Sequence, residues 1–183
     1  MLKKINLPNK LTLLRIAMVP LLIVCFYLNV SWWSYAAAVI FVLAYFTDML
    51  DGQIARKRNL ITDFGKLMDP MADKLLSVSA LVMLTAVDML NPIATIIIVA
   101  RELFISGFRL VAVEKGVVIA ASWMGKVKTV SQFVAITMVL LHDLTLRLVG
   151  FPLDMVVMWI SVFFTVVSGV DYVIKNKDTI SLE

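Results

Sequence analysis

The segment Asp48–Asp73 reads DMLDGQIARKRNLITDFGKLMDPMAD, and its sequence decides how the rest of the chain is interpreted. Asp48 and Asp51 are three residues apart, and Asp69 and Asp73 are four apart. In a helix, these spacings place the two members of each pair on one face. Apolar runs flank the segment, and a carboxylate at membrane depth is costly unless it faces water, a partner or a cation. We therefore expect four carboxylates to converge on bound metal.

Composition predicts an integral membrane protein. Of the 183 residues, 61% are hydrophobic and only 16% are charged, whereas about 25% of residues are charged in soluble domains. The net charge of +4 does not indicate a nucleic-acid partner, because Lys and Arg form no continuous basic stripe. The single cysteine, Cys25, has no partner for an internal disulfide and is expected to be a packing residue. We expect one domain over residues 1–183.

Six apolar segments are each close to the ~20 residues that a helix needs to span the hydrocarbon core. None alternates as a strand of a lipid-exposed barrel would, so the fold class is an all-α six-helix bundle over residues 9–175. Residues 1–8 are expected to form a short interfacial amphipathic helix, and His142–Pro152 a break. The expected spans are Asn9–Leu28, Trp32–Arg56, Gly65–Val87, Pro92–Glu114, Ser122–Leu141 and Leu153–Ile174.

The distribution of charge predicts the orientation. Nearly all Lys and Arg residues fall on the side of the N-terminus, and Arg147 alone falls on the other face. The positive-inside rule makes the basic side cytoplasmic, so both termini are expected there and His142 is expected outside, without a role. Acidic and basic residues enter only the inner half of the spans, which predicts a polar cavity open to the cytoplasm.

The residue types in the central segment favour particular ligands. Carboxylate oxygens suit Mg²⁺, Mn²⁺ or Ca²⁺ rather than zinc, and four of them could hold two ions about 3.5–4 Å apart. Gly52 and Gly65 are small residues that allow helices to approach closely or leave room for a ligand. Arg56 follows Gly52 by one helical turn and suits bidentate phosphate binding.

The motif D-x2-D-G-x2-A-R-x8-G-x3-D-x3-D over residues 48–73 resembles the signature of the CDP-alcohol phosphotransferase family. The resemblance extends along the whole chain, and its further parts are NLPNKLTLLR, DFGKLMDPMADKLL, ARELFISGFR, GKVKT and FFTVVSGVDY. It implies a homodimeric enzyme of the cytoplasmic membrane that makes phospholipid from CDP-diacylglycerol and releases CMP.

The resemblance also implies the roles of the site residues. Asp48, Asp51 and Asp69 would bind one divalent cation, Mg²⁺ or Mn²⁺, and Asp48, Asp69 and Asp73 a second. Asp73 would in addition take the proton from the acceptor hydroxyl. The residues expected to line the CDP site are Thr12, Gly52, Arg56, Thr62 and Gly65.

The acceptor implied by the resemblance is sn-glycerol 3-phosphate, a soluble dianion whose pocket needs fixed cations. Lys126 and Lys128 are two residues apart and cannot both face inward. With the help of the resemblance, we expect Arg101, Arg109 and Lys126 to be the phosphate ligands. The alternative is a structural Arg101–Glu102 ion pair, with the lysines extending to the interface.

Two other functions stay open from the sequence. The first is a reaction with inositol phosphate, serine or a second phospholipid as the acceptor, since the central motif handles only the shared CDP part. A divalent-cation transporter is the alternative from another class, because intramembrane carboxylates also mark ion pathways.

Overall fold

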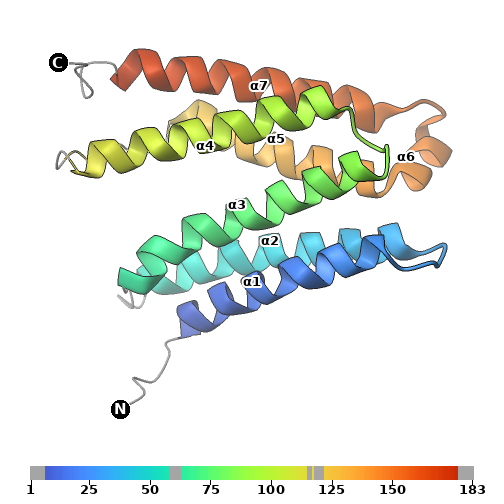
Figure 1. Ribbon diagram of the computed structural model, residues 1–183, viewed down its shortest axis with the longest axis horizontal. Helices are drawn as coiled ribbons and strands as arrows, with labels where there is room; N and C mark the ends of the chain where they lie inside the picture. The colour runs from blue at the N-terminus through green and yellow to red at the C-terminus, as the bar shows by residue number, and fades with distance from the viewer. Residues whose placement is uncertain (1–6, 58–62, 115–116, 118–121, 177–183) are drawn as a thin grey trace. The chain divides into compact units, whose positions relative to one another are not determined.

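The computed structural model describes residues 7–57, 63–114, 117 and 122–176; of these, the side chains of 7–9, 48–57, 63–70 and 73 are not described. Within these ranges all regular structure is helical and no strand occurs, which confirms the predicted all-α class (Figure 1). The helices are α1 (Leu7–Phe26), α2 (Trp33–Lys57), α3 (Asp63–Ala86), α4 (Pro92–Glu114), α5 (Trp123–Leu140), α6 (His142–Val149) and α7 (Leu153–Asn176).

Each of the six expected apolar segments corresponds to one long helix, α1 to α5 or α7. The chain does break between α5 and α7, as expected at His142–Pro152, but this stretch contains a short helix that was not predicted, α6, which lies at 88° to α5. The new helix begins as the backbone N–H groups of Leu144 and Thr145 donate to the Leu141 carbonyl. It ends at Gly150, which takes the left-handed conformation at φ 78°. A short amphipathic helix carries too few apolar residues to be visible in an analysis of hydropathy.

The chain divides into two compact units, and the first covers Met1–Val87. In this unit α1 contacts both α2 and α3, and α2 also contacts α3. Small side chains are buried along α2 and α3, namely Ala37, Ala38, Ala44, Ala72 and Ala80. Such residues allow helix backbones to approach closely. Cys25 is a free, buried thiol, as expected for a packing residue.

The second unit covers Asp88–Glu183, and α7 is the helix around which it is built. This helix contacts α4, α5 and α6. Met158 and Val162 are buried on α7. The apolar core of the unit also contains Ile98 of α4 and Ile136 of α5. A polar contact joins α6 to the start of α7. His142 Nδ1 on α6 lies 2.8 Å from Oδ2 of Asp154, which is fully buried.

Large apolar side chains are exposed on all the long helices, including Leu103, Phe104 and Leu110 on α4 and Phe163 on α7. In the part of the chain that the structure describes, α7 is the one helix long and apolar enough to cross a bilayer unaided. The bent pair α5 and α6 makes a second candidate when taken as one span. The six spans, the cavity and the helix predicted at residues 1–8 stay predictions, and residues 1–6 lie outside the described ranges.

Gly150 generates a prediction about stability. A side chain at φ 78° is strained, so Gly150→Ala should lower the free energy of unfolding by about 1 kcal/mol. The matched control is Gly107→Ala on α4, where an added Cβ meets nothing within 4 Å. That change should leave stability equal or slightly higher, since alanine is the better helix former. Thermal unfolding in detergent measures both, and equal melting temperatures for Gly150→Ala and wild type would contradict the prediction.

Candidate functional site

The four predicted metal ligands lie on two helices that contact each other in the first unit. Asp48 and Asp51 lie within α2, and Asp69 and Asp73 lie within α3. Both stretches are continuous helix, so each pair is separated by about one helical turn, as predicted. The side chains of these aspartates and of Arg56 lie outside the described residues, as do the surroundings of Gly52 and Gly65 and the whole of Thr62.

The donor atoms that the motif helices offer fit a hard divalent cation. Neither α2 nor α3 contains Cys or His, and their Asp side chains offer oxygen alone. Mg²⁺ and Mn²⁺ prefer oxygen ligands, whereas zinc sites draw on nitrogen and sulfur. Among the side chains that the structure describes, no group of three or more His, Cys, Asp or Glu residues could hold a metal elsewhere. The motif segment is therefore the candidate metal centre.

Helix α1 brings two buried polar side chains to the same unit. Thr12, which was predicted to line the CDP site, is fully buried, and so is Arg15 one turn later. A fully buried arginine is rare unless anionic groups compensate its charge. The motif aspartates belong to the two helices that α1 contacts, which makes Arg15 a candidate site residue. The sequence analysis did not single it out, although its spacing from Thr12 places both on one face of an apolar helix.

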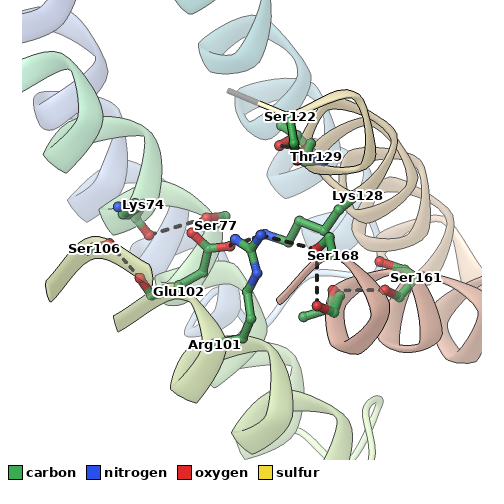
Figure 2. Close-up of polar contacts among 12 residues, drawn as sticks. Lys74, Ser77, Arg101, Glu102, Ser106, Ser122, Lys128, Thr129, Ser161 and Ser168 are labelled. Atoms are coloured by element: carbon green, nitrogen blue, oxygen red, sulfur yellow. Dashed lines mark hydrogen bonds and ion pairs between the residues drawn. The ribbon is translucent and has the colours of Figure 1, made fainter. Parts of the chain in front are cut away.

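A buried charge network joins three helices of the second unit, and we define it as Arg101, Glu102, Lys128 and Ser168. Arg101 Nη1 donates to Glu102 Oε1 at 3.3 Å and Nη2 donates to Ser168 Oγ at 3.1 Å. Lys128 Nζ forms an ion pair with the same Glu102 oxygen. Figure 2 shows Arg101 and Lys128 converging on Glu102 while Arg101 also reaches Ser168. One carboxylate thus holds two cations that come from α4 and α5.

The remaining predicted acceptor ligands lie on the same helices but outside this network. Lys126 is exposed on α5, whereas Lys128 is buried. Arg109 is exposed on α4, with its guanidinium carbon 5.6 Å from the ring centroid of Tyr172, a distance at which cation–π attraction acts. The Arg101–Glu102 ion pair considered from the sequence is present, and Lys128 extends it.

Helix α7 buries a polar stripe that the sequence analysis did not identify. Ser161, Thr165, Ser168 and Tyr172 are all buried and are spaced four, three and four residues apart, which places them on one helix face. Thr165 Oγ1 donates to the Ser161 carbonyl at 2.8 Å, and Ser168 Oγ donates to the Thr165 carbonyl at 3.1 Å. The spacing is visible in the sequence, but an analysis based on charge did not consider hydroxyl groups.

The network predicts that Glu102 is essential for stability. Glu102→Gln should lower the free energy of unfolding by about 3 kcal/mol, because the buried Lys128 and the largely buried Arg101 lose their counter-charge. The double variant Glu102→Gln with Lys128→Met should regain part of the lost free energy of unfolding, because it no longer contains one of those cations. The control is Glu114→Gln, an exposed position on the same helix, which should behave as wild type. A Glu102→Gln protein as stable as wild type in denaturant unfolding would show that the network does not compensate charge.

Comparisons with known proteins show the family of the chain. The family model described as CDP-alcohol phosphatidyltransferase matches residues 5–167. The protein named CDP-diacylglycerol–glycerol-3-phosphate 3-phosphatidyltransferase is 42% identical in Bacillus subtilis, over 96% of this chain and 97% of that one. Proteins of the same name are 40% identical in Rickettsia felis, over 91% and 93%, and 43% identical in Escherichia coli K12, over 74% and 76%. The chain therefore belongs to the CDP-alcohol phosphatidyltransferase family, as its central motif predicted.

Proposed function

We propose that this protein transfers the phosphatidyl group of CDP-diacylglycerol to sn-glycerol 3-phosphate, which gives phosphatidylglycerol phosphate and CMP. The observation that carries the proposal is the identity of 40 to 42% to relatives named for this reaction, over more than nine-tenths of both chains. The complete acidic motif on α2 and α3 supports the same chemistry. Because both substrates are anionic, the reaction depends on fixed positive charge and on positioning.

The motif residues would bind the CDP part of the lipid substrate. Asp48, Asp51, Asp69 and Asp73 would hold two divalent cations, Mg²⁺ or Mn²⁺. When bound, these ions neutralise the pyrophosphate and the charge that develops on the leaving CMP. The residues proposed to line the CDP site are Thr12, Gly52, Arg56, Thr62 and Gly65. Among them, Arg56 suits a phosphate group, because guanidinium forms paired hydrogen bonds with it.

The acceptor hydroxyl is deprotonated by Asp73 in this proposal. The hydroxyl oxygen of sn-glycerol 3-phosphate attacks the β-phosphorus, and the bond from that phosphorus to the oxygen of CMP breaks. Asp73 takes the proton, as a carboxylate within reach of the attacking oxygen does in general base catalysis. Arg101, Arg109 and Lys126 bind the acceptor's phosphate, and exposure of Arg109 and Lys126 gives a soluble substrate access to them.

The proposed setting is the cytoplasmic membrane, with six spans, both termini and the polar cavity on the cytoplasmic side, and a homodimer as the functional unit. Support comes from the apolar side chains exposed along the long helices, which a bilayer would cover. The length and composition of α7 also suit a membrane span. In this setting the acyl chains of CDP-diacylglycerol stay among the lipids while its head group enters the cavity.

A panel of acceptors tests the proposal. Purified protein in detergent with CDP-diacylglycerol and Mg²⁺ or Mn²⁺ should release CMP when sn-glycerol 3-phosphate is added, and the rate should be at least about a hundredfold lower with serine. Serine lacks the phosphate dianion, and loss of a charged contact of about 3 kcal/mol corresponds to a factor of that size.

Inositol phosphate is the informative control in the same assay, because it keeps the phosphate and changes the alcohol. Equal CMP release with inositol phosphate and sn-glycerol 3-phosphate would contradict the assigned acceptor while leaving the family chemistry intact. Metal flux into proteoliposomes, without CMP release from CDP-diacylglycerol whichever acceptor is added, would instead indicate a cation transporter.

A further inference from the structure

Arg101 crosses from α4 to α7 and is held there at two points. Its Nη2 donates to Ser168 Oγ at 3.1 Å, and an added Cβ at Gly169 would lie 3.3 Å from Arg101 Cγ. The aliphatic part of the arginine therefore lies against the backbone of Gly169 while its tip reaches the serine beside it. Only glycine at this position leaves the arginine stem its full space.

The hydroxyl of Ser168 is oriented to receive the guanidinium. The hydroxyl proton is used in a hydrogen bond, because Ser168 Oγ donates to the Thr165 carbonyl at 3.1 Å. The lone pairs of Oγ therefore accept the hydrogen bond from Arg101. Ser168 is buried, and the contact is therefore shielded from competing water. On the other edge of the guanidinium, Glu102 accepts from Nη1 and is itself held by Lys128.

This arrangement leaves hydrogen-bonding capacity on Arg101. A guanidinium has five N–H groups, and Glu102 and Ser168 each accept one of them. Among the residues that the structure describes, Nε has no hydrogen-bond partner although it is buried. A buried donor in this state is costly, and such groups call for an explanation such as a ligand. The side chain as a whole is 15% exposed, so an anion in solution has access to part of it.

We propose that Ser168 and Gly169 are positioning residues that hold the Arg101 guanidinium for the phosphate of the acceptor. The inference rests on the proposed function, in which Arg101 binds that phosphate. It extends the acceptor site to a helix from which no ligand was predicted. Ser168 and Gly169 touch Arg101 and not the substrate, so they act on acceptor affinity through the orientation of one side chain.

The test is the kinetics of CMP release by the purified full-length protein in detergent. Ser168→Ala should raise the KM for sn-glycerol 3-phosphate about tenfold, because Arg101 loses a hydrogen bond to an oriented acceptor. The kcat and the KM for CDP-diacylglycerol should change less than about twofold. Ser168→Thr keeps the hydroxyl and should restore the acceptor KM. Gly169→Ala should raise the same KM, because its methyl group displaces the Arg101 stem.

The matched control is Ser161→Ala, which makes the same chemical change at a buried serine of α7 whose hydroxyl has no hydrogen-bond partner among the described residues. It should leave both KM values unchanged. If Ser168→Ala does not fold, Gly169→Ala carries the test with the same expectation. A rise in acceptor KM for Arg101→Lys, with no rise for Ser168→Ala or Gly169→Ala, would overturn the positioning role and leave Arg101 as a ligand.

Failure of the proposed function gives a different result. Wild-type protein would then release no CMP in response to sn-glycerol 3-phosphate, whatever residue occupies position 168. An equal rise in both KM values for Ser168→Ala would also overturn the inference, because it would indicate a general structural defect.

Discussion

Charge buried inside an apolar helical protein must be compensated, and this constraint governs both units of the structure. Glu102 holds Arg101 and Lys128 from two different helices, and a hydroxyl of α7 takes up a further N–H of the arginine. Arg15 is fully buried on α1, beside the two helices that carry the acidic motif. Removal of a partner from such a group is strongly destabilising, so the helices cannot shift independently of these contacts.

The two units also divide the groups that the proposed reaction needs. The first unit contains the four aspartates on α2 and α3 and the buried Thr12 on α1. The second contains the basic residues proposed for the acceptor, and α7 contacts two of them, Arg101 through Ser168 and Arg109 through Tyr172. In the proposed reaction, the residues that bind the CDP part therefore come first in the sequence, and the residues that select the acceptor alcohol follow them.

The long helices could be predicted from the sequence because apolar runs of about 20 residues are strong signals, and the predicted Pro92–Glu114 matches α4 at both ends. The short helix α6 could not, because eight amphipathic residues resemble a polar loop in hydropathy. The acidic motif was recognisable from its spacing alone. The spacing of Lys126 and Lys128 showed that only one could face inward, but packing against α7 and the ion pair with Glu102 of α4 decide that Lys128 is the buried one. Hydroxyl groups on α7 become informative only once Arg101 is seen to reach them.

The central claim is that the aspartates of α2 and α3 hold divalent cations on which the substitution at the lipid pyrophosphate depends. The most direct measurement is CMP release by wild type and Asp69→Asn as Mg²⁺ or Mn²⁺ is titrated into chelator-treated protein. Wild type should be inactive without metal and recover on its addition, and Asp69→Asn should lose at least about a thousandfold in rate at every metal concentration, a loss of roughly 4 kcal/mol in transition-state stabilisation. Full turnover by Asp69→Asn, or by wild type free of metal, would contradict the account.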